Sequence, residues 1–228
     1  MLPKDPFTFL ISFEGLDAVG KTTLATRLVA HLTSVNVSAR MFPEFSDSPI
    51  GELLTDSIRK YNFVKLHPNL DTPFSETLLL MADQSAKTET LPMLDSSTIV
   101  IADRYSDSLI AYQIPRILRS NRGLPSEQVR RLLERWVKAL FREPHLTFLI
   151  QAPLELVLKR VQIRDSYAPT TQDIEFFNQA DSIYTNLASR NKKRFVKLDG
   201  TKEIEELWSE IIQIVSTKLA RHGIVRQS

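Results

Sequence analysis

The sequence predicts an α/β fold with three layers, in which helices cover both faces of a five-stranded parallel sheet. Short runs rich in apolar, β-branched or aromatic residues alternate along the chain with segments whose apolar residues recur every three or four positions. Strands that alternate with helices are typical of crossover units, which build parallel sheets. The run Thr98 to Ala102 lacks polar alternation, as expected for a strand buried on both faces.

Five segments have the composition of strands: Phe9 to Phe13, Ser38 to Phe42, Thr98 to Ala102, Leu146 to Ile150 and Phe195 to Leu198. Between them, helical spacing predicts three apolar helix faces, formed by Leu24, Leu28 and Leu32, by Val129, Leu132, Leu133, Trp136 and Leu140, and by Ile204, Leu207, Ile211 and Val215. Two proline-containing stretches, 60–73 and 165–172, predict loops, and the residues after Arg221 are expected to fray.

Length and composition favour one globular domain spanning residues 1–228. The chain has 228 residues, of which 43% are hydrophobic and 25% charged. No apolar run is long enough to span a bilayer, and the N-terminal residues lack the pattern of a secretory signal. We therefore expect no membrane partner.

Charge and residue usage exclude several kinds of site. The chain has no cysteine, which rules out disulfides and thiolate catalysis and favours the cytoplasm. The net charge of +2 comes from interleaved signs without the clustered basic footprint of a nucleic-acid-binding protein. The four histidines share no metal-ligand spacing, so we interpret them as structural or surface residues.

A complete Walker A pattern, Gly15 to Thr22, directly follows the first predicted strand. Its glycines let successive backbone N–H groups turn inward around a phosphate, and the following helix presents its positive N-terminal end. Lys21 can reach the terminal phosphates of ATP, and the Thr22 hydroxyl can ligate Mg²⁺. We expect Lys21 to lie on an exposed glycine-rich loop. A chance match is expected in about one chain in a hundred of this length. The pattern predicts a P-loop NTPase in which the nucleotide contacts Gly15, Asp17, Ala18, Val19, Gly20, Lys21, Thr22 and Thr23.

Asp103 and Arg104 follow the buried run at Thr98 to Ala102. The carboxyl ends of parallel strands are where ligands bind in open α/β sheets. Asp103 can therefore hold Mg²⁺, directly or through water, and Arg104 can neutralise an incoming phosphate. The alternative is a surface ion pair at a strand end, and the Walker A pattern nearby favours the functional interpretation.

With these motifs placed, the chain resembles the thymidylate kinases over nearly its whole length. The resemblance is carried by Phe13 to Asp17 with Gly20 to Thr23, Phe42 to Glu44, Ile50 to Glu52, Asp103 to Ser108 with Ala111 to Gln113, Arg122 to Pro125, Pro144 to Phe148 and Leu198 to Gly200. It implies transfer of the γ-phosphoryl group of ATP, with Mg²⁺, to a deoxynucleoside monophosphate, by default dTMP. It also implies a homodimer.

The resemblance further implies roles for individual residues. Asp17 would contact the acceptor sugar, Arg104 its phosphate, and Tyr105 would crowd the ribose 2′ position. The segment Leu198 to Thr201, with Asp199 and Gly200, would pass beside the adenine of ATP. The remaining acceptor-site positions are Glu44, Leu80, Gln84, Ser108, Leu109 and Gln113.

The sequence departs from the family pattern at the lid, residues 165–172. Family members supply a cation to the transferring phosphoryl from the P-loop or from the lid. This chain has Ala18 and Val19 in the loop and no Lys or Arg in the lid. Arg160 and Arg164 are four residues apart and so lie on one helix face, from which either could supply this cation. The alternative is that both belong to a solvated helix surface.

The predicted base pocket also departs from the pattern. Leu80 and Gln84 replace an aromatic residue and an Arg, and Leu109 replaces a hydroxyl residue. Gln151 stands where bacterial relatives usually have Asp. Two alternatives therefore stay open: a paralogue that acts on another nucleotide or nucleoside-like acceptor, and a low-activity nucleotide-binding module.

Overall fold

The computed structural model describes residues 9–61, 72–94, 97–120, 123–166, 168–222 and 224. Its strands are β1 (Phe9–Glu14), β2 (Ala39–Phe42), β3 (Ile99–Asp103), β4 (Leu146–Gln151) and β5 (Phe195–Asp199). Its helices are α1 (Lys21–Ser34), α2 (Pro49–Tyr61), α3 (Pro73–Glu89), α4 (Ser106–Ser120), α5 (Ser126–Leu140), α6 (Leu154–Asp165), α7 (Thr171–Arg190) and α8 (Ile204–Arg221), with a 3₁₀ turn at Leu91–Met93.

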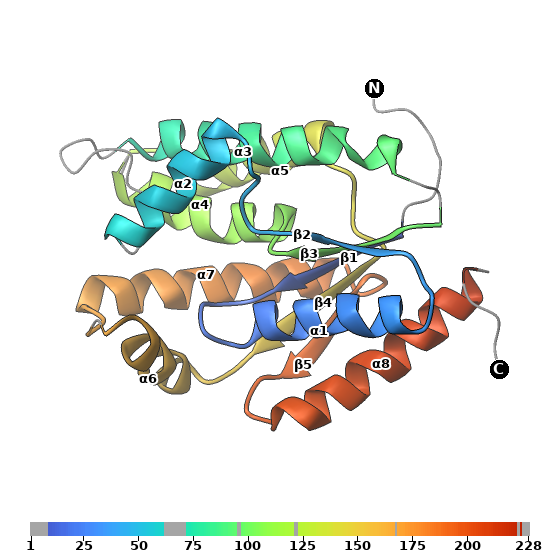
Figure 1. Ribbon diagram of the computed structural model, residues 1–228. Coiled ribbons are helices and arrows are strands. Elements are labelled where there is room, and N and C mark those ends of the chain that lie inside the picture. Colours follow the sequence, from blue (N-terminus) through green and yellow to red (C-terminus); the bar gives the residue numbers. More distant parts are fainter. Residues whose placement is uncertain are drawn as a thin grey trace.

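The strands form one five-stranded parallel sheet in the order β2-β3-β1-β4-β5. In Figure 1, α1 and α8 lie on one side of the sheet, and α3, α4 and α5 lie on the other. The predicted three-layer α/β fold is confirmed. Each predicted strand agrees with the observed one to within one residue at either end.

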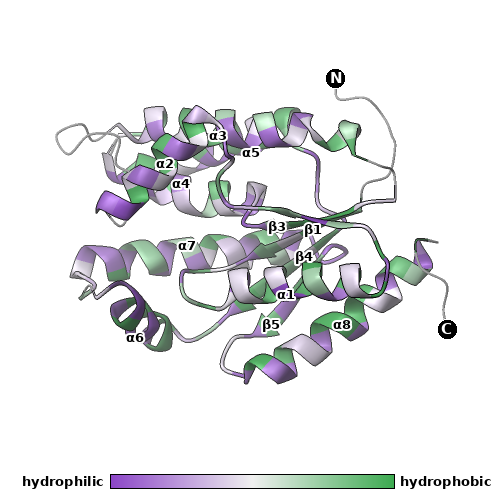
Figure 2. Ribbon diagram, in the orientation of Figure 1, coloured by the Kyte–Doolittle hydropathy of each residue, from purple (hydrophilic) through white to green (hydrophobic). Residues whose placement is uncertain are grey.

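The central strands are buried on both faces. Every residue of β1 and β3 is buried, and successive residues belong to two hydrophobic clusters. Phe9, Ile11 and Phe13 join the larger cluster, and Leu10 joins the smaller one. Hydrophobic and hydrophilic residues alternate along the outer helices (Figure 2). Because all five strands run parallel, their carboxyl ends meet at one edge of the sheet, where the candidate site lies.

The predicted helix faces are buried to different extents. Leu24, Leu28 and Leu32 of α1 are all buried, as are Leu207, Ile211 and Val215 of α8. In α5 only Val129 and Leu133 are fully buried, whereas Leu132 and Leu140 are 36% and 39% exposed. None of the described helices combines the length and apolar character that a membrane crossing requires.

The two predicted loops are only partly described. Residues 62–71 and Tyr167 lie outside the described residues, as do Arg122 and most of the tail after His222. The predicted lid at 165–172 is shorter than expected, because α6 extends to Asp165 and α7 begins at Thr171. The early start of α7 has a local cause, since Thr170 and Asp173 form a reciprocal capping box.

One histidine supports the start of the central strand β1. The Leu10 backbone N–H donates to His145 Nδ1 at 3.0 Å, which requires a neutral imidazole because a protonated ring has no acceptor. Burial, followed by the charges of His222 and Arg142, lowers the pKa of His145. The unfolded chain then binds the proton more readily. The stability that the neutral ring contributes is therefore complete above the ordinary histidine pKa and is lost as the pH falls through the folded value.

We predict that His145→Gln reduces the loss of folding stability at acid pH, because a glutamine oxygen can accept the same N–H without titrating. Between about pH 7.5 and pH 5, the wild type should lose about 1 kcal/mol more stability than the variant, the typical worth of one hydrogen bond. Urea denaturation at a series of pH values measures the difference. Parallel pH profiles for the two proteins would contradict the prediction.

Candidate active site

The loop between β1 and α1 has the backbone that the Walker A pattern predicts. Gly15 has φ +133°, and a Cβ there would lie 2.3 Å from the Ile150 carbonyl oxygen, so no other residue fits. Gly20, with φ +94°, is the N-cap of α1. Ala18 has φ +58°, Val19 is buried, and Thr23 is exposed in the first turn. The loop is therefore a tight turn that leads directly into the N-terminus of a helix, an arrangement suited to phosphate.

Lys21 is more enclosed than the sequence predicts. We expected an exposed loop residue, but Lys21 is only 5% exposed, and its Nζ donates to the Leu16 carbonyl oxygen at 2.6 Å. The expectation was wrong because the flexible side chain folds back onto its own loop. Burial, reinforced by the charge of Arg104, lowers the pKa of Lys21 to about 8. A phosphate placed in the loop would favour the charged form.

Thr22 and Asp103, which are 81 positions apart in sequence, meet at the sheet edge. The Thr22 hydroxyl donates to Asp103 Oδ2 at 2.5 Å. Within the described residues there is no group of three or more histidine or acidic side chains that could hold a metal. Mg²⁺ usually keeps several waters and uses one or two protein ligands together with substrate phosphates, so this hydroxyl and carboxylate fit such an ion.

Arg104 lies at the centre of the site in an uncommon conformation. Its φ is +63°, a left-handed value that is rare outside glycine. The buried guanidinium donates to Asp17, to the Gly15 carbonyl oxygen at 3.0 Å, and pairs with Glu44 at 3.2 Å. It also stacks over the Tyr112 ring at 4.8 Å. Burial alone would raise the pKa of Asp17, but Arg104, with Lys21 and Arg164, holds it below its ordinary value.

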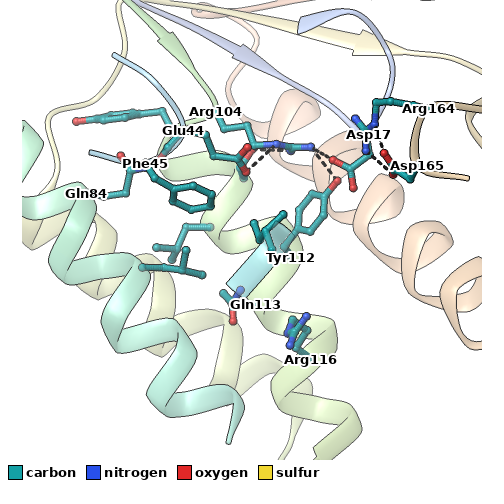
Figure 3. A pocket seen from close by; sticks show the side chains of 15 residues that line it. Asp17, Glu44, Phe45, Gln84, Arg104, Tyr112, Gln113, Arg116, Arg164 and Asp165 are labelled. Carbon is teal, nitrogen blue, oxygen red and sulfur yellow. Dashed lines mark hydrogen bonds and ion pairs between the residues drawn. The ribbon is translucent and has the colours of Figure 1, made fainter. Parts of the chain in front are cut away.

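A cavity of about 370 Å³ opens beside Arg104 (Figure 3). The structure brings all the predicted acceptor-site residues to its wall: Asp17, Glu44, Leu80, Gln84, Arg104, Tyr105, Ser108, Leu109 and Gln113. Sequence reasoning missed other members of the wall: Phe45, Ile58, Tyr112, Arg116 and Asp165. For Phe45 a signal existed, because it directly follows the recognised segment Phe42 to Glu44.

The wall furthest from the charged groups is largely apolar or internally bonded. Leu80 and Leu109 supply apolar surface, and the Tyr105 hydroxyl bonds to Thr88 at 2.9 Å. Burial raises the pKa of Tyr105 to about 12, so this hydroxyl stays protonated. Gln84 Nε2 donates to the Glu44 carbonyl oxygen at 2.9 Å, which fixes the amide orientation. Gln84 therefore keeps one orientation, and its Oε1, which is buried without a hydrogen-bond partner among the described residues, can still accept a bond from a ligand.

The structure separates the two candidate lid arginines. Arg164 lines the cavity, where it forms a bidentate pair with Asp165 at 2.6 and 2.7 Å. Arg160 instead donates to the Gly200 carbonyl oxygen at 3.1 Å. Arg164 is thus directed towards the acceptor side, and Arg160 supports the loop after β5.

Residues at the carboxyl ends of β4 and β5 form a second wall at this edge of the sheet. The Gly200 N–H donates to the Gln151 carbonyl oxygen at 2.7 Å, and Asp199 accepts bonds from the Thr201 backbone and hydroxyl. The Gln151 side chain donates to Asp181 at 3.0 Å and to Thr185 at 2.9 Å. Gln151 therefore ties β4 to α7, a role that an Asp could not take because its charge would repel Asp181.

Comparisons with known proteins agree with this geometry. A family model described as thymidylate kinase matches residues 13–211. The chain is 32% identical over 212 residues to a thymidylate kinase of Sulfurihydrogenibium sp. (strain YO3AOP1), covering 90% of this chain and 95% of that protein. Thymidylate kinases of Acinetobacter baumannii (strain AYE) and Kosmotoga olearia are 28% identical over 209 residues and 29% over 219. These alignments cover 90% and 94% of this chain, and 99% of each relative.

We predict that Lys21→Met leaves the fold intact and lowers phosphoryl transfer at least a hundredfold. Methionine has a similar length and fills the same enclosed space, so no cavity opens. The variant lacks the charge that stabilises the phosphoryl oxygens in the transition state, which is typically worth several kcal/mol. Circular dichroism and an ADP-release assay measure the two properties. Near-normal turnover by a folded variant would remove Lys21 from the mechanism.

Proposed function

The chain belongs to the thymidylate kinase family of nucleoside monophosphate kinases, and on that premise we propose that it transfers the γ-phosphoryl group of ATP to dTMP. One observation carries this proposal beyond the family name. The phosphate loop, the Thr22–Asp103 pair and the Arg104 cavity all lie at one edge of the sheet. This arrangement supports a donor site and an acceptor site that would lie side by side, as direct transfer requires.

On the donor side, the loop from Gly15 to Thr23 would hold the phosphates of ATP, with Lys21 directed at the transferring group. Thr22 and Asp103 would hold Mg²⁺, which when bound neutralises charge on the phosphates. Gly200 and Asp199 support the wall beside the adenine. Because the Thr22 hydroxyl and the Asp103 carboxylate already touch, little rearrangement is needed to share one ion.

On the acceptor side, Arg104 would bind the 5′-phosphate of dTMP. Its guanidinium is fixed by Asp17 and Glu44, so the charge is oriented before the substrate arrives. Asp17 would also contact the sugar. The Tyr105 ring, held in place by its bond to Thr88, would crowd the ribose 2′ position and favour deoxyribose.

We also propose a homodimer and a cytoplasmic location. Leu53 on α2 and Leu78 on α3 are 49% and 53% exposed, and the two helices pack together. This apolar surface suits a second copy of the chain, because exposed leucines of neighbouring helices are stabilised by burial. The requirement for ATP favours the cytoplasm.

We predict that the enzyme discriminates weakly among deoxynucleoside monophosphates. Leu80 and Leu109 offer no polar contact to a base edge, and apolar walls reject the wrong ligand less strongly than unpaired buried polar groups do. We expect kcat/KM for dTMP to exceed that for dUMP and dCMP by less than about a hundredfold. In Leu109→Ser, kcat/KM for dTMP should be about fivefold higher than in the matched variant Leu109→Ala, which corresponds to one net hydrogen bond.

Steady-state kinetics on the panel of monophosphates decides this prediction. Strong selection of dTMP by the wild type, with no difference between the two Leu109 variants, would show that the base binds elsewhere in the cavity. Turnover of no deoxynucleoside monophosphate would contradict the proposed function itself.

We predict that Arg164 supplies a second cation beside Lys21, which Ala18 and Val19 of the phosphate loop and residues 165–172 do not provide. Arg164→Ala should lower kcat by roughly a thousandfold, the usual contribution of an arginine in phosphoryl transfer, with little change in ATP affinity. Arg160→Ala is the matched control, since it should weaken ATP binding by loosening Gly200 and largely preserve kcat. A wild-type kcat in both variants would show that neither Arg164 nor Arg160 supplies this cation.

A further inference from the structure

Glu14 is a buried acid that does not line the cavity. It is the last residue of β1, and its side chain is fully buried. Glu14 Oε1 accepts the Tyr105 backbone N–H at 3.0 Å, and Oε2 accepts the Ser108 hydroxyl. Both contacts fall in the segment that begins at Arg104. The carboxylate therefore constrains the main chain immediately after a residue held in the left-handed region.

The same carboxylate ends a chain of hydroxyl groups that starts at the Arg104 guanidinium. Arg104 Nη1 lies 3.3 Å from Ser108 Oγ and 3.4 Å from the Tyr184 hydroxyl, which are 2.7 Å from one another. An arginine can only donate, so both hydroxyl protons must point away from it. Tyr184 then donates to Ser108, and Ser108 donates to Glu14. An ionised carboxylate, which only accepts, completes this direction of donation.

We propose that Glu14 is a positioning residue for acceptor binding, which fixes Arg104 through Tyr105, Ser108 and Tyr184 without touching the substrate. The inference rests on the proposed kinase activity, because it assigns Arg104 to the acceptor phosphate. Buried hydrogen-bonded networks of this kind hold a side chain in one orientation, so less ordering remains to be done when the ligand binds.

Charged groups from several elements face Glu14. Asp107 on α4 lies close to it and is held by a bidentate pair with Arg194 at 2.7 and 2.8 Å. Burial, followed by the charge of Asp107, raises the pKa of Glu14 to about 8, while Ser108, Arg104 and Arg194 act in the opposite direction. Tyr184 faces it from α7. The carboxylate form that completes the network therefore predominates only at alkaline pH.

Glu14→Gln tests the network without changing its volume. The amide oxygen can still accept the Tyr105 N–H. The amide nitrogen, however, places a donor opposite Ser108, so Ser108 can no longer donate to residue 14. Calorimetry should show a rise of roughly tenfold in the Kd for dTMP at about pH 9, where Glu14 is ionised. At about pH 6.5 Glu14 of the wild type is protonated and also presents a donor to Ser108, so the Kd for dTMP of the two proteins should differ less than about twofold. Affinity for ATP with Mg²⁺ should not change.

Ser12→Ala is the matched control, because Ser12 is equally buried on β1 and bonds Thr147 at 2.9 Å, away from Arg104. It should lower Tm and leave both affinities unchanged. Tyr184→Phe should weaken dTMP binding, and its effect should not multiply with that of Glu14→Gln, since both act through one network. If another deoxynucleoside monophosphate has the higher kcat/KM, it replaces dTMP in these titrations.

Two outcomes would overturn the inference. One is wild-type affinity for dTMP in Glu14→Gln at about pH 9. The other is an equal loss of dTMP and ATP affinity at both pH values, with a Tm below that of Ser12→Ala, which would indicate a purely structural role. A wild type that binds dTMP without phosphorylating it would contradict the proposed function alone, because calorimetry still reports on Glu14.

Discussion

The site depends on burying the charge of Arg104 at the sheet edge. A buried guanidinium is costly unless it is paired and its N–H groups are bonded. Here Asp17 and the Gly15 carbonyl oxygen of the phosphate loop, together with Glu44 of the segment after β2, supply those partners. Two parts of the fold thus converge on the side chain at the end of β3, and the left-handed backbone at Arg104 is retained because they over-determine its position.

The segment after β2 can take part only because α3 holds it. Lys87 Nζ donates to the Pro43 and Glu44 carbonyl oxygens at 2.8 and 2.7 Å and pairs with Asp83 at 3.6 Å. Asp83 in turn accepts bonds from Ser46. Lys87 and Asp83 are buried, so removing a partner of either would leave an uncompensated polar group. The carboxylate of Glu44 is therefore delivered to Arg104 by a rigid attachment rather than by a free loop.

Local patterns predicted the fold and the glycine-rich turn after β1, whereas contacts between residues far apart in sequence could not be predicted. Unbroken apolar runs and the Walker A spacing are visible within a dozen residues, so the strands and the phosphate loop followed from them. Ser108 and Tyr184 are 76 positions apart, and Gln151 and Asp181 are 30 apart. No spacing rule connects such pairs. Lys21 was misjudged for a related reason: its enclosure comes from tertiary packing of a flexible side chain, which sequence alone does not encode.

The distribution of polar groups around the cavity indicates how the acceptor is recognised. At the apolar end, the amide nitrogen of Gln84 is bonded to Glu44, and the carbonyl oxygen of Gln113 accepts the Thr77 hydroxyl at 2.9 Å. The Tyr105 hydroxyl is likewise engaged by Thr88. The charged end, by contrast, gathers Arg104 and Arg164, whose donors suit an anion. Binding energy should therefore come mainly from the phosphate, because polar groups already paired within the protein contribute little to a new ligand. At the apolar end, Gln84 Oε1 has no partner among the described residues, so it leaves one acceptor for the base beside the shape of the wall.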